Sequence, residues 1–388
     1  MSSFSARIGD AGLMRASLLL TSRLRSFYTF PKIMKLAIML PNWVGDACMA
    51  TPTLRALRHG AKEFQEICWI GRPGPLMVLD GLPWADARIV YKPRARGGEI
   101  LSRRGLVREM RRRRFDAMVL ITNSLSTAAI AWLAGIPRRI GYARDSRSWL
   151  LTDRIPIIEG GRNAYTDPCI DTYLRLAAYL GCDVSDRRME LAVTDQDRQR
   201  TDMLWDKLAF ETDRLTVVLN TGAATADTKR WPIDHAVATA KSLSRCYGAQ
   251  VLVHCGPAER EIADAIQARA GDPRVRSMGC LSSLPLGLSK GVIERADLVI
   301  STDSGPRHMA VSFNKPIVTL FGSVSPDLTQ TYNRPETILA MGLDCQPCGK
   351  YQCPLKHARC MKDLDSQRVI AAAAKIIEES PKMLRRAS

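Results

Sequence analysis

Residues 296–308 of this chain read Ala-Asp-Leu-Val-Ile-Ser-Thr-Asp-Ser-Gly-Pro-Arg-His. The apolar run at 298–300 predicts a buried parallel strand, and the Ser-Gly-Pro turn after it predicts the start of a helix. A second apolar run follows that helix at 317–322, so the segment is predicted to be a βαβ unit of a parallel α/β sheet. Ser304 or Asp303 is expected to cap the helix, with its first free N–H groups facing a phosphate-type ligand. An ordinary helix cap without a ligand is the alternative.

Short apolar runs alternate with helical patterns along most of the chain. Strands are predicted at residues 35–40, 67–70, 88–91, 117–121, 215–220, 250–254, 274–276, 298–301, 317–320 and 337–339. Helices are predicted at residues 46–58, 100–113, 124–134, 167–180, 196–208 and 366–379. The fold class is therefore α/β, with two doubly wound domains in series whose carboxyl edges face a ligand cleft.

A polar, charged stretch near the middle of the chain marks the join between the two domains. The predicted divisions are an N-terminal domain at 34–190, a linker at 191–213, a second domain at 214–365, and a terminal helix and tail at 366–388. Residues 1–33, rich in Ser and Arg, are expected to lie outside the core. A dispensable tail or an early start codon is the favoured interpretation, because Met34 directly precedes the first strand. A transit-like or membrane-surface segment is the alternative.

The composition favours anionic partners. The chain has 388 residues, 56 Lys and Arg against 39 Asp and Glu, and a net charge of +17. Phosphorylated substrates, acidic lipid surfaces and nucleic acid all fit this charge, but no zinc-finger, RNA-recognition or helix-turn-helix pattern occurs, so nucleic acid is not expected. No apolar run reaches the ~18 to 20 residues of a membrane-spanning helix. Eleven scattered cysteines argue against a secreted disulfide framework and for a reducing cytoplasm.

Polar residues follow several of the predicted strands. Asp46 follows the first strand, where a carboxylate is either a helix cap or a general base facing the cleft. Thr221 and Gly222 open a loop that leads to Lys229, whose charge suits a departing phosphate. Glu259 follows another strand and is either a partner for ribose hydroxyls or a surface carboxylate in a first helical turn.

As a set, these loops resemble glycosyltransferase family 9, the heptosyltransferases of bacterial lipopolysaccharide synthesis, and in particular the members that add the second heptose. The likeness runs from about residue 35 to 380. The motifs that carry it occur in the family's order: Trp43-Val44-Gly45-Asp46, the AGIPRRIGY segment at 134–142, Lys229-Arg230-Trp231-Pro232, Asp303-Ser304-Gly305 with His308, and Phe321-Gly322-Ser323 with Ser325-Pro326.

The resemblance implies a GT-B fold, two Rossmann-like domains around a deep cleft, with no catalytic metal and no required cofactor. It implies ADP-heptose as the donor and a lipid-anchored, phosphorylated saccharide of the heptosyl–Kdo–lipid A type as the acceptor, with inversion at the anomeric carbon. The expected location is the cytoplasm, peripheral to the anionic inner-membrane surface.

The resemblance also assigns roles to residues. Asp46 is the implied general base, and Lys229 stabilises the departing ADP. The implied donor-binding residues are Thr221, Gly222, Lys229, Glu259, Asp303, Ser304, Gly305 and His308. The implied acceptor-binding residues are Trp43, Arg139 and Tyr142.

Two positions depart from the family pattern. Thr221-Gly222-Ala223 stands where Pro-Gly-Ala is usual, and Arg307 replaces a commonly apolar residue. The reaction class is unaffected, but the sugar and nucleotide preference stays open. Two alternatives therefore remain: a family relative that uses another activated sugar or acceptor, and a non-catalytic nucleotide- or nucleic-acid-binding protein.

Four cysteines, Cys345, Cys348, Cys353 and Cys360, lie within sixteen residues. One structural zinc held by four thiolates is one hypothesis; thiols that only pack or oxidise are the other. The segment is expected to lie near the terminal helix and away from Asp46, so no chemistry is assigned to it.

Overall fold

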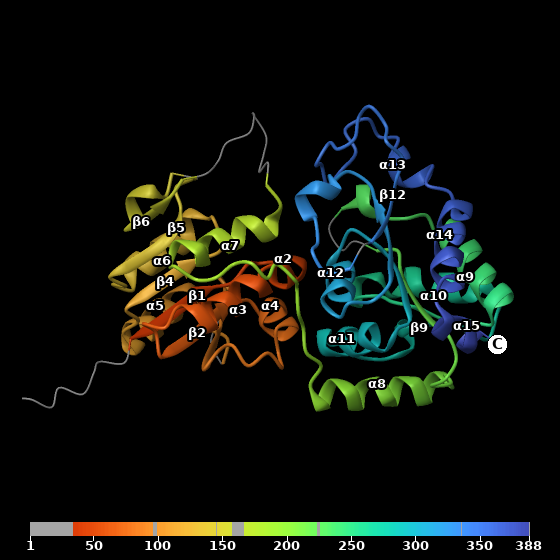
Figure 1. The fold of residues 1–388 in the computed structure, drawn as a ribbon, viewed down its shortest axis with the longest axis horizontal. Helices are drawn as coiled ribbons and strands as arrows, with labels where there is room; N and C mark the ends of the chain where they lie inside the picture. Colours follow the sequence, from red (N-terminus) through yellow and green to blue (C-terminus); the bar gives the residue numbers. More distant parts are fainter. Residues whose placement is uncertain are drawn as a thin grey trace, which may run out of the picture.

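The computed structural model describes residues 34–95, 99–144, 146–156, 167–222, 226–334 and 336–387. It has two α/β domains that lie side by side (Figure 1). The predicted extension at 1–33 and Ala223 of the departing loop motif lie outside the described residues. Among the described residues, no helix is both long and apolar enough to cross a bilayer.

The N-terminal domain is built on a six-stranded parallel sheet with the strand order β3-β2-β1-β4-β5-β6. Its elements are β1 (Lys35–Met39), α2 (Val44–Met49), α3 (Thr51–Gly60), β2 (Glu66–Gly71), α4 (Pro73–Val78), β3 (Ala87–Val90), α5 (Arg103–Arg113), β4 (Ala117–Leu120), α6 (Leu125–Leu133), β5 (Arg138–Tyr142), η1 (Ser148–Leu150), β6 (Asp153–Ile155) and α7 (Cys169–Tyr179).

The C-terminal domain has the same design, with the strand order β12-β11-β10-β7-β8-β9 and all strands parallel. It follows α8 (Asp195–Leu208) and comprises β7 (Thr216–Asn220), η2 (Asp227–Lys229), α9 (Ile233–Tyr247), β8 (Gln250–Val253), η3 (Pro257–Glu259), α10 (Arg260–Ala270), β9 (Val275–Ser277), η4 (Met278–Cys280), α11 (Leu286–Arg295), β10 (Leu298–Thr302), α12 (Gly305–Ser312), β11 (Ile317–Phe321), η5 (Pro326–Thr329), β12 (Thr337–Ala340), α13 (Arg359–Lys362), α14 (Ser366–Glu378) and α15 (Pro381–Ala387).

The strand orders fix where a ligand can bind. In each sheet the chain reverses its winding direction next to the first strand, between β1 and β4 in one domain and between β7 and β10 in the other. Ligands of doubly wound sheets bind at such points, outside the carboxyl ends of the strands, because neighbouring loops diverge there. The loops after β1, β4, β7 and β10 are therefore the candidates for the functional site.

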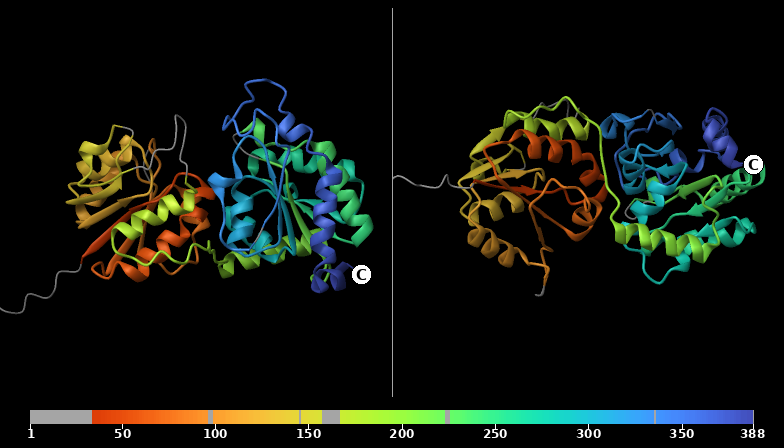
Figure 2. Two further views of the ribbon diagram at one scale, coloured as in Figure 1. Left: turned by 45° about the horizontal axis from the view of Figure 1, so that its top comes forward. Right: turned by 60° about the horizontal axis from the view of Figure 1, so that its bottom comes forward.

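Alternation along the strands separates two faces of the N-terminal sheet. Leu36 and Ile38 of β1 pack with α2, α3 and α7 in a core that continues into the C-terminal domain. Ala37 and Met39 point to the other face, where α5 and α6 cover a separate core. The α5–α6 side of the sheet is thus the side turned away from the C-terminal domain (Figures 1 and 2).

The two domains contact each other directly, through α2 with α12, α4 with α11 and α7 with η5. After α7 the chain crosses to α8, which packs on α11 of the C-terminal domain (Figure 2). The ammonium of Lys290, whose side chain is fully buried on α11, lies 3.1 Å from the Asp197 carboxylate and donates to the carbonyl oxygens of Asp80 and Ala192. Lys290 therefore ties the C-terminal domain both to the linker and to the N-terminal domain.

The predicted α/β architecture is confirmed; one predicted helix needs correction, and two strands and one helix were not predicted. The helix predicted at 46–58 is divided into α2 and α3, with Ala50 between them and a proline in the first turn of α3. The strands β5 and β6 were not predicted, because β5 begins with two arginines and contains a glycine, and β6 at the edge of the sheet has only three residues, two of them charged. The short helix α4, which begins at Pro73, was also not predicted.

Candidate active site

A cavity of about 360 Å³ lies where the carboxyl edges of the two sheets meet. It is lined from the N-terminal domain by Trp43, Val44, Gly45, Asp46 and Met49, and from the C-terminal domain by Lys229, Asp303, Ser304, Gly305, His308, Thr329 and Tyr351. The proposed base, the proposed leaving-group lysine and the Asp-Ser-Gly turn are thus brought to one cavity, although they are up to 259 positions apart (46 to 305) in the sequence.

Asp46 lies in the first turn of α2, as the third residue of the helix, and does not cap it. The N-cap position is Trp43, which makes no side-chain capping bond, so the helix-cap prediction for Asp46 is wrong. The Asp46 carboxylate instead accepts a hydrogen bond of 3.2 Å from the hydroxyl of Tyr173 on α7. Burial raises the pKa of Asp46 above the ordinary aspartate value, and the Tyr173 hydrogen bond and the charge of Lys229 offset only part of this rise.

Lys229 lies at the end of η2 and points at the turn after β10. Its ammonium is 2.7 Å from the Asp303 carboxylate and also donates to the Asp303 carbonyl at 3.1 Å. Burial alone would raise the pKa of Asp303, but the charges of Lys229 and Arg307 hold it below its ordinary value. The lysine is therefore a fixed positive charge at the edge of the cavity.

Arg307 supports this arrangement from behind. Its side chain is fully buried and binds both carboxylate oxygens of Glu336, at 2.9 and 3.0 Å, as well as Asp303 at 3.0 Å. The guanidinium also donates to the hydroxyl and carbonyl of Thr329, and it lies over the ring of Phe321. Arg307 thus compensates two buried carboxylates and anchors the loop that carries Thr329 into the cavity. The sequence showed only that this position departs from the family pattern.

The start of α12 differs from the prediction. Ser304 occupies the N-cap position, but its hydroxyl makes no capping bond; it donates to the Thr302 carbonyl instead, and Asp303 is held by its cations. Pro306 has no N–H, and the amides of Arg307 and His308 donate to the Ser304 carbonyl. The Gly305 amide is therefore what the helix start offers to an anion, rather than the row of free N–H groups that was expected.

The loops after β7 and β10 are joined through Asn220, to which the sequence analysis assigned no role. The amide nitrogen of Asn220, at the end of β7, donates to the hydroxyls of Ser301 and Ser304 at 3.0 Å. Thr302 in turn donates to the carbonyl of Gly222 at 2.8 Å. The loop after β7 is thereby fixed to the turn after β10. The two strands are neighbours in the sheet.

Two further predicted donor residues lie beside this loop. The Thr221 carbonyl accepts a hydrogen bond from the backbone of Trp231, which places the start of α9 next to the loop. The carboxylate of Glu259 lies over Gly222 so closely that a Cβ added there would be 2.1 Å from Oε1. Glu259 therefore faces the loop after β7 and also accepts a hydrogen bond from Gly256 in its own turn.

His308 closes the cavity between the domains. A Cβ added at Gly45 would lie 2.8 Å from the ring carbon Cδ2 of His308, so only glycine fits at this contact of α2 with α12. Burial and the neighbouring Arg307 charge lower the pKa of His308 to about 4, and the imidazole is neutral near pH 7. His308 thus acts as an uncharged packing surface for the N-terminal domain.

The three predicted acceptor residues do not lie together. Trp43 is 57% exposed and borders both the interdomain cavity and a neighbouring one of about 260 Å³ between the loops after β1 and β4. Arg139 donates to the backbone carbonyls of Leu150 and Ile136, and Tyr142 donates to the carbonyl of Thr172. The geometry therefore supports Trp43 in this role, and Arg139 and Tyr142 stay predictions without such support.

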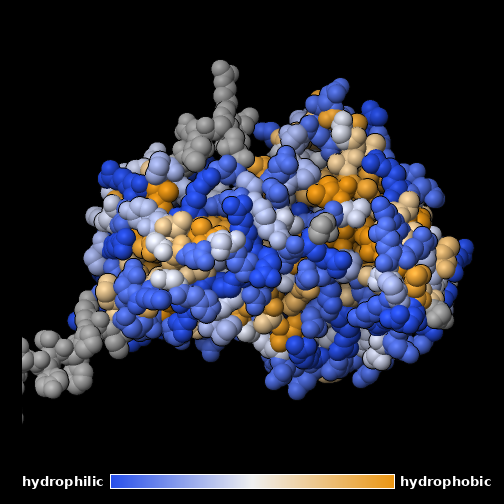
Figure 3. Space-filling view, viewed as in Figure 1, coloured by the Kyte–Doolittle hydropathy of each residue, from blue (hydrophilic) through white to orange (hydrophobic). Residues whose placement is uncertain are grey.

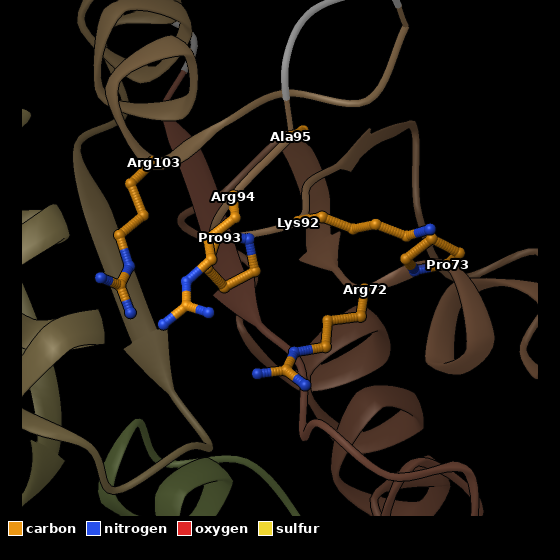
Figure 4. A pocket seen from close by; sticks show the side chains of 7 residues that line it. All are labelled: Arg72, Pro73, Lys92, Pro93, Arg94, Ala95 and Arg103. Atoms are coloured by element: carbon orange, nitrogen blue, oxygen red, sulfur yellow. The ribbon is translucent and has the colours of Figure 1, made fainter.

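A separate pocket with a basic lining, of about 560 Å³, lies further along the same edge of the N-terminal sheet. Arg72 follows β2, Lys92 and Arg94 follow β3, and Arg103 begins α5; Figure 4 shows their side chains around the pocket. No acidic partner is recorded for these four cations within the part of the chain that the structure describes. The pocket was not predicted, because its cations come from three separate segments.

The cysteine-rich segment lies closer to the cavity than expected. The hydroxyl of Thr228, next to Lys229, donates to the carbonyl of Lys350 at 2.6 Å, and Tyr351 lines the cavity. The expectation that this segment lies away from Asp46 is therefore wrong. Within the described ranges, no three His, Cys, Asp or Glu side chains gather as a metal-binding group, so the zinc hypothesis gains no support from the geometry.

The buried Arg307 network makes a prediction about stability. The pKa values of Glu336 and Asp303 in the native state lie below their ordinary values of 4.5 and 3.8. Their ionised carboxylates therefore stabilise the native state at a pH above the ordinary values, and this contribution is lost as the pH falls through the lowered native-state pKa values. In Arg307→Met, Glu336 stays buried but loses the guanidinium that compensates its charge, so its pKa should rise. The destabilisation should therefore grow as the pH rises from 4 to 7, reaching about 3 to 5 kcal/mol.

Urea unfolding at several pH values checks this, with Arg334→Met as the control on the same loop. A loss of stability in Arg307→Met that is the same at every pH would show that the arginine acts through packing alone.

The comparisons with known proteins agree with this geometry. The model of glycosyltransferase family 9 (heptosyltransferase) matches residues 103–359, more than half of the chain. Lipopolysaccharide heptosyltransferase 2 of Escherichia coli is 25% identical over 349 residues, covering 87% of this chain and 97% of that protein.

Two solved structures share the fold. The structure of E. coli ADP-heptose lipopolysaccharide heptosyltransferase II has a TM-score of 0.69 and 23% identity, and the match covers 89% of this chain and 100% of that one. E. coli heptosyltransferase WaaC with ADP-2-deoxy-2-fluoro heptose has a TM-score of 0.63 and 17% identity, with 89% and 99% covered. The predicted GT-B fold and glycosyltransferase class are confirmed, and the chain belongs to glycosyltransferase family 9, the heptosyltransferases.

Proposed function

We propose that this enzyme transfers a heptose from ADP-heptose to a phosphorylated, lipid-anchored inner-core saccharide of lipopolysaccharide, with inversion and without a catalytic metal. One observation carries the proposal: Asp46 of one domain and the Lys229–Asp303 pair of the other line a single interdomain cavity. A base and a leaving-group cation on opposite domains suit an in-line displacement at a sugar carbon held between them.

The donor belongs to the C-terminal domain in this proposal. The loop at Thr221 and Gly222 and the turn at Ser304 and Gly305 are fixed to each other at the switch point of the sheet, where nucleotides bind in doubly wound folds. Glu259 is placed to accept hydrogen bonds from ribose hydroxyls. The solved relative WaaC holds an ADP-heptose analogue, which supports ADP-heptose as the donor here.

Asp46 is the proposed general base. Burial raises its pKa, so the ionised carboxylate is a stronger base than that of an exposed aspartate. The acceptor hydroxyl gives its proton to Asp46 as its oxygen attacks the anomeric carbon from the face opposite ADP. The new glycosidic bond therefore has the inverted configuration.

Lys229 and the Gly305 amide are the proposed partners of the departing ADP. The negative charge on the diphosphate grows as the bond to the sugar breaks, and a positive charge already fixed by Asp303 stabilises that state without rearrangement. In this mechanism these groups supply the charge that a metal ion supplies in other transferases.

The acceptor belongs to the N-terminal domain. Trp43 offers an exposed ring to a sugar beside Asp46. The pocket formed by Arg72, Lys92, Arg94 and Arg103 lies beyond β2 and β3, on one side of β1, and is proposed to hold acceptor phosphates. The acceptor would then lie along the carboxyl edge of the sheet with its lipid outside. We place the reaction at the cytoplasmic face of the inner membrane for this reason.

Release of ADP from ADP-heptose with a deep-rough lipopolysaccharide acceptor tests the proposal directly. Asp46→Asn should lower turnover by about 100-fold or more, because the base is lost, and should leave ADP-heptose affinity unchanged. Glu63→Gln, an exposed carboxylate in the same domain, should behave like the unaltered enzyme.

Full activity in Asp46→Asn would contradict the assigned base. Binding of ADP-heptose without turnover on any inner-core acceptor would favour a different acceptor or the non-catalytic alternative. If the chain neither binds nor turns over ADP-heptose, the result would favour another activated sugar.

The pH dependence of kcat/KM tests the Tyr173 contact. Asp46 must be ionised, so activity falls as the pH drops through its raised pKa. The Tyr173 hydrogen bond lowers that pKa, so Tyr173→Phe should move the acidic limb to higher pH. Tyr179→Phe, on the exposed part of the same helix, should leave the limb in place, and an unmoved limb in both variants would contradict the contact.

Lys229→Ala should lower kcat by about 100-fold while weakening donor binding much less, because the charge matters most as ADP departs. Steady-state kinetics combined with calorimetric titration of ADP-heptose separate the two effects. Lys382→Ala, an exposed lysine on α15, is the control. An unchanged kcat in Lys229→Ala would remove the lysine from the mechanism.

A further inference from the structure

Large hydrophobic side chains are exposed on the side of the N-terminal sheet that faces away from the C-terminal domain. Trp132 on α6 is 51% exposed and Trp149 on η1 is 66% exposed, and their rings pack edge to face with centroids 6.3 Å apart. Leu133 and Leu125 of α6 are 46% and 45% exposed. Trp132 follows Leu125 by seven residues, so both lie on the same face of the helix. Neither core of the N-terminal domain includes these four side chains.

The neighbouring helix α5 is strongly basic. Residues 103–114 contain seven arginines and one acidic residue, Glu109, which pairs with Arg112 and Arg113. In the described part of the chain, no acidic partner is recorded for the exposed Arg103, Arg104, Arg108, Arg111 or Arg114. The positive charge of this helix is therefore directed to solvent.

The basic and hydrophobic groups form one surface. α5 packs against α6, and Nε of Arg111 donates to the backbone carbonyl of Leu133 at 2.9 Å. At its other end α5 begins with Arg103, which lines the basic pocket (Figure 4). The eleven residues of α5 span roughly 16 Å, so the tryptophan pair and the pocket lie about one short helix apart.

Tryptophan side chains beside unpaired arginines are the combination that the headgroup layer of an anionic bilayer attracts. The rings place their apolar bodies among the upper acyl chains and their N–H groups among the headgroups, while arginines bind lipid phosphates. Charge complementarity favours such a bilayer over a second copy of this chain, which has a net charge of +17. The face of the molecule seen in Figure 3 is mostly hydrophilic, with hydrophobic patches on both domains.

We infer that the α5–α6 face, defined as Arg104, Arg108, Leu125, Trp132, Leu133 and Trp149, docks the enzyme on an anionic lipid bilayer. Docking here leaves the interdomain cavity open, because the face lies on the other side of the sheet from the C-terminal domain. It also brings the basic pocket close to the lipid surface, where the headgroup phosphates of an anchored acceptor would lie. The choice of a bilayer as the partner rests partly on the proposed lipid-anchored acceptor.

Vesicle co-sedimentation tests the inference without any substrate. The full chain should bind vesicles of phosphatidylethanolamine with phosphatidylglycerol and not vesicles of phosphatidylcholine alone, and the binding should weaken with salt. Arg104→Gln with Arg108→Gln, and separately Trp132→Ser with Trp149→Ser, should each weaken binding by about 10-fold or more.

Matched controls remove similar groups elsewhere. Met203→Ser takes away a side chain that is 70% exposed on α8, and Lys375→Gln with Lys382→Gln takes away two charges from the C-terminal domain. Both should bind vesicles like the unaltered chain, and thermal unfolding should be the same in all four variants.

The outcomes distinguish docking from catalysis. Unweakened binding in both α5–α6 variants would overturn the inference, as would self-association that disappears in the tryptophan variant while vesicles are not bound. Turnover of a soluble, delipidated acceptor should be unchanged in these variants. Lost vesicle binding with retained turnover supports the docking face, even if the natural acceptor differs from the one proposed.

Discussion

The site depends on one contact in which there is no room for a side chain: Gly45 at the start of α2 packs on the ring of His308 in α12. Each of these helices follows a strand at the switch point of its own sheet, so their contact brings the two ligand-binding edges together. The imidazole is neutral because burial lowers its pKa to about 4, and it therefore packs without adding charge next to Asp46. The interdomain cavity is the space left beside this contact.

Beside that contact, a chain of charged side chains runs from the buried interior to the cavity. Arg307 and Glu336 are buried and satisfy each other, Asp303 binds both Arg307 and Lys229, and Lys229 reaches the cavity. The deepest members give the outermost one a fixed position, as a preorganised transition-state partner requires. The same pattern appears on the acceptor side, where Tyr173 of α7 holds Asp46 from a helix far along the chain. Asp46 and Lys229 are thus positioned by side chains from other elements of the fold.

Most of the fold could be predicted, because parallel strands buried on both faces leave continuous apolar runs such as 298–300. Asp46, Lys229 and Asp303 could be predicted because each follows a strand in a recognisable motif. Tyr173 could not, since it reaches the site from α7, a segment without a motif. Asn220 and Tyr351 stand next to residues that the sequence does mark, Thr221 and the cysteines, but only tertiary packing shows their contacts. Arg307 was visible only as a departure from the family pattern, because its partner Glu336 lies 29 positions later. The basic pocket could not be predicted for the same reason, because its cations come from three segments that are separate in the sequence.

The most direct test of this account is the turnover of Gly45→Ala compared with Gly74→Ala. A Cβ at Gly45 would lie 2.8 Å from His308, whereas one at Gly74 would lie at an ordinary 3.4 Å from Val44. We expect Gly45→Ala to lower kcat by about 100-fold, because the proposed base moves away from the donor sugar, while ADP affinity changes only a few-fold. Gly74→Ala should turn over like the unaltered enzyme. Equal turnover in the two variants would contradict the claim that this contact sets the geometry of the active site.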